Sequence, residues 1–145
     1  MNWKSEAVDK LRQYEAKKLS LVNIPLEISR LESAARGIRS AASDGTPVSG
    51  GGSGREDMLL SNIVHREELE RSLEQAQKWV ALVDAALAIL STEERLLLER
   101  FYVHPARGHV DKLCGELGLE KSQVYAKKDS AIRHFTISLY GCCET

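Results

Sequence analysis

The spacing of apolar residues constrains this sequence most, because it repeats in threes, fours and sevens over two long stretches. Such spacing places apolar side chains along one side of a helix and is typical of helices that pair lengthwise. The first stretch carries Ala7, Leu11, Tyr14, Leu21, Ile28, Leu31, Ala35 and Ile38. The second carries Leu59, Ile63, Leu69, Leu73, Ala76, Val80, Val83, Leu87 and Leu90. We therefore predict two long amphipathic helices.

A Gly- and Ser-rich segment, residues 43–54, separates the two stretches. This composition is typical of a flexible linker, and as a random coil the segment would span about 19 Å. Because two packed helices lie about 8–10 Å apart, the linker can join them as an antiparallel pair. We predict a helical hairpin, a coiled-coil-like arm, over residues 1–90. Pro25 lacks an amide donor, so we expect a break or kink near Asn23 and Ile24, with Pro25 in the first turn of a second segment.

Composition favours an all-α fold. Hydrophobic residues make up 43% of the chain and charged residues 28%, which is ordinary for a folded protein. No run of β-branched or aromatic residues has the period of two that a strand requires. No apolar run reaches the roughly 18 residues of a membrane span, and the polar start is unlike a signal peptide. The three cysteines include no C-x-x-C pair, so we expect neither a disulfide scaffold nor a zinc site. We therefore expect the protein to work in a reducing cytoplasm.

A second region is predicted to begin at Ser91. The order Ser-Thr-Glu-Glu at residues 91–94 is a capping box, in which the first and fourth residues cap each other's amides. The capping box begins a helix, and the Pro and Gly of residues 104–108 end that helix. Residues 109–117 then predict a short helix with Gly118 as its left-handed C-cap. A short helix, a Gly turn and a second helix with a polar start form the layout of a helix-turn-helix. We predict such a domain, with three to four helices, over residues 91–141.

The second helix of this motif carries the candidate DNA contacts, because its exposed first turns enter the major groove in helix-turn-helix proteins. Val124 is expected to point into the core, and successive residues of a helix point about 100° apart. One face of this helix therefore points away from the core, and two further polar residues flank that face at the start of the helix. Glutamine pairs with adenine edges, lysine with guanine or phosphate, and serine and tyrosine with phosphate. The candidate DNA-binding residues are Lys121, Ser122, Gln123, Tyr125, Lys128 and Arg133.

Charge supports this assignment only locally. The whole chain has a net charge of −1, which does not indicate a nucleic-acid partner. Residues 121–134, however, hold four cations against the single acid Asp129, a local excess of three positive charges. We expect Asp129 to pair with Arg133, four residues further along the helix. The alternative interpretation is an ordinary three-helix bundle with no role in DNA binding.

These residues resemble a known family. The matching segments are residues 90–95, Phe101-Tyr102, residues 113–125 and residues 131–135. They resemble region 4 of bacterial sigma factors and, more closely, the sigma-like phage regulators of the ArpU and RinA type. The resemblance implies a regulator of phage or prophage late genes, active in the cytoplasm of the bacterial host, that binds promoter DNA with the helix beginning near Lys121. Two positions depart from the family pattern: Glu120 stands where Ser or Thr is usual, and Lys127 stands at an aliphatic position.

No pattern in the chain predicts an enzyme, a cofactor or a metal. The nearest metal-ligand types, His104, His109 and Cys114, do not share one helical face. We expect double-stranded DNA as the main partner, with self-association or RNA polymerase contacts through the arm. Two other functions stay open: a DNA-recognition subunit similar to a phage small terminase, and a helical interaction module that does not bind DNA.

Overall fold

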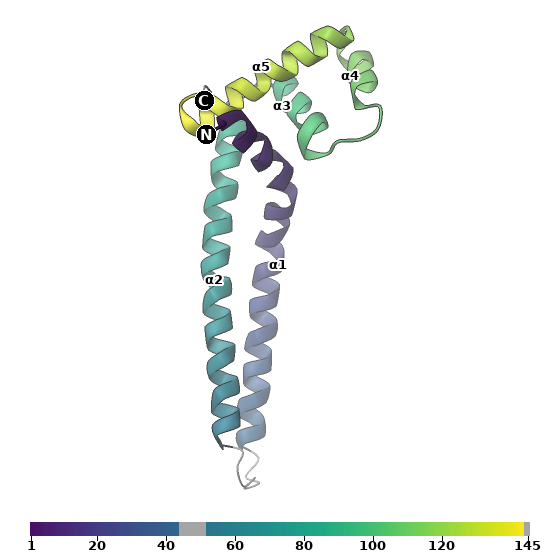
Figure 1. Cartoon of the computed structure of the whole chain (residues 1–145). Helices are drawn as coiled ribbons and strands as arrows, with labels where there is room; N and C mark the ends of the chain where they lie inside the picture. The colour runs from purple at the N-terminus through teal and green to yellow at the C-terminus, as the bar shows by residue number, and fades with distance from the viewer. Residues whose placement is uncertain (44–51, 144–145) are drawn as a thin grey trace. The chain divides into compact units, whose positions relative to one another are not determined.

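The computed structural model describes residues 1–43 and 52–143, and all of its regular structure within these ranges is helical. The all-α prediction is therefore confirmed. Within these ranges the elements are five α-helices, which Figure 1 labels, and one π-helix directly after α3. Their bounds are α1 Trp3–Ser43, α2 Gly52–Ala88, α3 Thr92–Leu98, η1 Glu99–Val103, α4 His109–Leu117 and α5 Lys121–Tyr140.

The two long helices extend further than the linker prediction allowed. Ser43 belongs to α1, and residues 52–54 belong to α2. The remainder of the predicted linker, residues 44–51, lies outside the described residues. Helix propagation adds one hydrogen bond per residue, so an established long helix can include glycine near its end despite glycine's poor propensity.

The predicted break at Pro25 is wrong, because α1 continues through it from Trp3 to Ser43. Proline removes the hydrogen bond that its amide would donate to the carbonyl of Leu21. Pro25 lies on the exposed side of the helix, so water can hydrate that carbonyl. The packing of the apolar stripe on both sides of Pro25 then holds the helix together.

The chain forms two compact units. Unit 1 contains residues 1–17 together with the chain from Trp79 onward, and unit 2 contains residues 18–78. The first turns of α1 and the last turns of α2 therefore belong with α3, η1, α4 and α5. Packing divides the chain within the two long helices, whereas the sequence placed a domain boundary between residues 90 and 91.

Unit 2 contains one segment of α1 and one segment of α2, and a buried polar residue forms a hydrogen bond between them. Asn62 is buried and donates a hydrogen bond from Nδ2 to the backbone carbonyl of Leu31, at 2.8 Å. Its Oδ1 accepts a hydrogen bond from Arg66 Nε, also at 2.8 Å. The spacing of apolar residues predicts Ile63 in the apolar stripe, but Ile63 is exposed. With Asn62 and Arg66 included, the spacing on α2 becomes a regular alternation of three and four from Leu59 onward.

Unit 1 has two apolar clusters, which α3 separates. The main core combines α1, α2, α3 and α5, and its fully buried members include Leu11, Val83, Leu98 and Phe135. The α4 core contains Leu97, Leu113 and Val124, with Leu119 packed against them. Leu97 and Leu98 are neighbours on α3 and turn toward different clusters, since successive helical residues point about 100° apart. These clusters fix α4 and α5 against the rest of unit 1.

The predicted helix start at Ser91 and the predicted helix end at Gly118 are confirmed. The helix that begins after Ser91 is α-helical only to Leu98, and the π-helix η1 continues it to Val103. The Ser91 hydroxyl accepts a hydrogen bond from the Glu94 amide, and the Ser91 amide donates to the Glu94 carboxylate, both at 3.1 Å. Gly118 adopts the left-handed conformation with φ of 66° and ends α4. Leu119 then donates its amide to the carbonyl of Cys114, at 3.2 Å, and returns into the α4 core. The chain can therefore turn sharply between α4 and α5.

One glycine inside α4 and one directly after it give a matched pair of predictions. Gly115 lies inside the helix and Gly118 lies at the left-handed cap, and a methyl group would meet open space at both positions. We expect Gly115→Ala to stabilise the protein by about 0.5–1 kcal/mol, because alanine favours the helix. We expect Gly118→Ala to destabilise it by about 1–2 kcal/mol, because φ would have to stay positive. Denaturant unfolding measures both. Equal effects of the two changes would contradict the assigned cap.

Candidate nucleic-acid interface

The N-terminal half of α5 presents the predicted residues on its outer surface. Lys121, Ser122, Gln123 and Tyr125 are all exposed, while the intervening Val124 is completely buried in the α4 core. Arg133 is exposed further along the same helix. This alternation follows from the helical period, because Val124 anchors the first turn and the neighbouring positions turn toward solvent.

Gln123 has a structural role as well as an exposed position. The backbone amide of Glu120, directly before α5, donates a hydrogen bond to Gln123 Oε1, at 3.0 Å. This bond satisfies one of the amides that a helix N-terminus leaves without a partner. The Gln123 carbonyl oxygen is thus engaged in the cap, and its amide nitrogen is the group left to contact a base or phosphate.

Lys128 is held within unit 1 and is only 17% exposed. Its ammonium group lies 2.7 Å from the Asp129 carboxylate and over the rings of Phe101 and Tyr125, at 5.4 and 5.8 Å from their centroids. Burial opposes the charge, but hydrogen bonds to Asp129 and Tyr102 outweigh it and raise the pKa of Lys128. The predicted pairing of Asp129 with Arg133 is wrong, because Lys128 is the nearer cation and its charge is partly removed from water.

Tyr125 is supported by a group of aromatic side chains around Phe101. The Phe101 ring lies edge-on to Tyr125 with a centroid distance of 5.8 Å, and edge-on to His109 with a distance of 4.7 Å. Edge-to-face contacts of this kind are favourable and directional. Phe101 comes from η1, so this π-helix positions an exposed residue of α5. The sequence indicated Phe101 only as part of a segment that resembles the sigma family, since nothing local indicates a contact with Tyr125.

Two acids at the start of α3 bind side chains of α5. Lys127 Nζ lies 2.7 Å from Glu93, and His134 Nδ1 lies 2.6 Å from Glu94. Desolvation disfavours the charged form of Glu94, but hydrogen bonds from Ser91 and His134 exceed this effect, and the pKa of Glu94 is lowered. Lys127, which departs from the sigma-family pattern, therefore joins α5 to α3.

These pairings reduce the basic excess expected from the sequence. Lys127 and Lys128 are each compensated by a carboxylate, whereas Lys121 and Arg133 have no ion-pair partner within the described residues. The exposed surface of α5 thus offers two uncompensated cations, Lys121 at its start and Arg133 further along, together with hydroxyl and amide groups. This combination can bind phosphate oxygens and base edges. Only two of the four cations in residues 121–134 are free of a carboxylate partner within the described residues.

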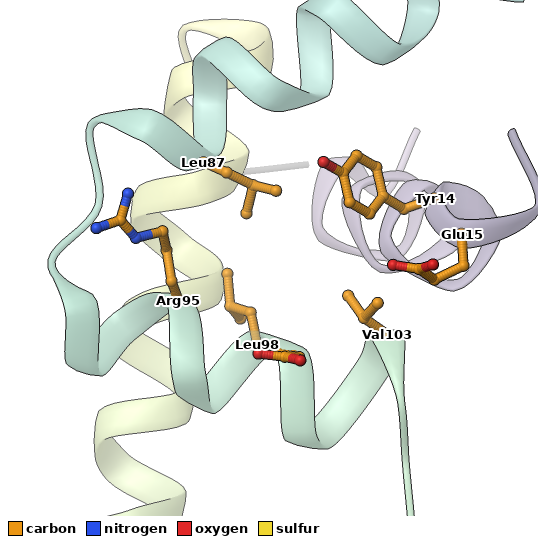
Figure 2. Close-up of a pocket in the computed structure, with 7 residues that line it drawn as sticks. Tyr14, Glu15, Leu87, Arg95, Leu98 and Val103 are labelled. Atoms are coloured by element: carbon orange, nitrogen blue, oxygen red, sulfur yellow. The ribbon is translucent and has the colours of Figure 1, made fainter. Parts of the chain in front are cut away.

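The cleft shown in Figure 2 does not form a better candidate site. It has a volume of about 230 Å³, below the roughly 300–1,000 Å³ of ligand pockets, and Leu87, Leu98 and Val103 contribute its apolar lining. The Tyr14 hydroxyl at its edge is hydrogen-bonded to Asp84, and burial together with this bond raises the pKa of Tyr14. Its lining residues within the described ranges include no Ser, Thr or Cys nucleophile.

No three His, Cys, Asp or Glu side chains among residues 1–43 and 52–143 are grouped so as to hold a metal ion. None of the helices in these ranges combines the length and apolar character of a membrane span.

Comparisons with known proteins give no match: no family model, curated protein or solved structure is significantly similar to this chain.

Proposed function

We propose that this chain belongs to the class of helix-turn-helix DNA-binding proteins, with α5 as the recognition helix. The observation that carries the proposal is the exposed start of α5. Its buried side packs against α4 in the α4 core, and the turn at Gly118 joins the two helices. Val124 holds this turn in the core while Lys121, Ser122 and Gln123 face outward. A recognition helix needs this arrangement, because its first turns must enter the major groove while another helix supports it.

Within this class, we propose a transcriptional regulator of phage or prophage late genes, of the sigma-region-4-like ArpU and RinA type. The sequence resemblance over residues 90–140 supports this narrower function. The capping box at Ser91 and the turn at Gly118 lie at positions that the resemblance covers.

Removing polar groups from the start of α5 should weaken DNA binding. We expect Lys121→Ala and Gln123→Ala each to cost about 1–3 kcal/mol of specific binding energy if they contact base edges. If Lys121 contacts a phosphate instead, the slope of log affinity against log salt should fall by about one. Fluorescence anisotropy at two or more salt concentrations, with fragments of the host element as probes, measures both quantities.

Two controls separate these effects from damage to the fold. Gln123→Glu keeps an acceptor for the Glu120 amide but removes the amide donor, so it should preserve stability and still weaken DNA binding. Lys78→Ala removes a cation of unit 2 that pairs with Glu74 at 3.0 Å, and it should leave DNA affinity unchanged. Wild-type protein that binds no fragment at low salt would contradict the proposed function and favour the interaction module.

We propose that unit 2 mediates self-association or contacts RNA polymerase. Among its described residues only Leu31, Ala35, Asn62 and Ala76 are buried. An isolated pair of helices with so small a core is marginally stable, because helices depend on tertiary packing. Sedimentation velocity distinguishes the assemblies: a dimer favours the regulator, and a ring of eight or more copies favours the small-terminase alternative.

A further inference from the structure

An open groove runs between the start of α1 and the middle of α5, within unit 1. Its volume is about 440 Å³. Lys4, Ser5 and Arg12 of α1 contribute one side, and Asp129 and Ile132 of α5 contribute the other together with Tyr102 of η1. Two cations from the first turns of the chain therefore lie beside the helix that carries the candidate DNA contacts.

The groove adjoins the outer face of α5. Asp129 lines it and is also exposed, four residues after Tyr125 and four residues before Arg133. Because residues four apart are neighbours on a helix surface, a duplex that contacts Tyr125 and Arg133 must pass the edge of this groove. The groove is therefore placed to meet the sugar-phosphate backbone beside the bases that α5 contacts.

The charges of the groove suit a polyanion. Asp129 is its one acidic lining residue among those described, and Lys128 compensates it at 2.7 Å. Lys4 is exposed and has no ion-pair partner in the described part of the chain. Arg12 lies 3.8 Å from Asp9, and both side chains are more than half exposed. Such a pair contributes little, so the Arg12 guanidinium can turn toward a phosphate at small cost.

We propose that this groove binds the DNA backbone and that Lys4 and Arg12 are phosphate contacts outside the helix-turn-helix. The inference rests on the proposed DNA-binding function and extends its footprint to α1. Phosphate contacts strengthen binding without selecting a sequence. Lys4 and Arg12 should therefore raise affinity for specific and nonspecific duplexes equally.

The test compares full-length wild-type protein with the double variant Lys4→Ala/Arg12→Ala. We expect affinity for a duplex to fall about 5- to 50-fold at low salt, and the slope of log affinity against log salt to fall by about two. The ratio of specific to nonspecific affinity should stay the same. Both residues are exposed, so unfolding curves should be nearly unchanged and will show that the variant is folded.

A matched control lies on the same helix. Lys10 packs over the rings of Trp79 and Tyr140, at 5.9 and 5.8 Å from their centroids, and does not line the groove. Lys10→Met removes one cation but keeps a long apolar stem, and the salt slope should remain that of the wild type.

The outcomes separate the two proposals. If Lys121→Ala weakens binding but Lys4→Ala/Arg12→Ala does not, the groove proposal is overturned and the proposed function stands. If the wild type binds no DNA at low salt, both are overturned. Binding of a poly-glutamate peptide by that wild type, abolished in the double variant, would then identify an acidic protein segment as the occupant of the groove.

Discussion

Replacing Phe135 with alanine is expected to lower the free energy of unfolding of unit 1 by about 3–5 kcal/mol. Phe135 is completely buried in the main core, where residues of α1, α2, α3 and α5 meet. Truncation removes the apolar surface of the ring and leaves a cavity that four helices cannot close without losing other contacts. A loss of this size is a large part of the stability of a small domain.

Tryptophan fluorescence measures this effect in unit 1 directly. The two tryptophans of the chain, Trp3 and Trp79, both belong to unit 1. Ile137→Ala is the matched control, because Ile137 lies on the same helix and is 40% exposed. It should cost much less than the Phe135 variant. Equal costs for the two variants would contradict the assigned core.

The second large effect is expected for Leu113→Ala, at about 2–5 kcal/mol. Leu113 is completely buried in the α4 core with Leu97 and Val124. It is the one fully buried residue of α4 within the described structure, so its loss should loosen α4 from α3 and α5. Urea unfolding followed by fluorescence and circular dichroism measures the change.

Conservative replacement gives the control for Leu113. Leu113→Met keeps nearly the same apolar volume and should cost less than about 1.5 kcal/mol. If α4 braces α5 for DNA binding, Leu113→Ala should also weaken DNA binding at temperatures where the protein remains folded. A Leu113→Ala protein with wild-type stability would show that α4 does not depend on this core.

Local features of unit 1 were predictable because they depend on residues three or four positions apart. The Ser91 capping box, the left-handed Gly118 and the return of Leu119 into the core are of this kind. The exposure of Ser122 and Tyr125 also followed, since one buried anchor, Val124, sets the orientation of the helical turn.

Features that join distant parts of the chain were not predictable in the same way. The sequence predicted that Ile63 would lie in the apolar stripe of α2, but Ile63 is exposed and its neighbour Asn62 is buried instead. Asn62 donates a hydrogen bond to the Leu31 carbonyl of α1, a contact that the pattern of apolar residues does not indicate. Lys128 looked like a free cation, but Phe101 and Tyr102 of η1 cover it. Nothing within four residues of Lys128 indicates those contacts.

By itself, the sequence determined that this chain is all-α, that α3 begins after Ser91, and that α4 ends at Gly118 before α5 begins. Helical period, caps and glycine conformation are local, and their energies act whatever the rest of the chain does. The tertiary structure alone decided that residues 1–17 pack with the C-terminal helices and that Lys4 and Arg12 lie beside α5. The contacts of residues 1–17 with α5 join residues more than a hundred positions apart. Their energy comes from burying side chains that no local pattern pairs.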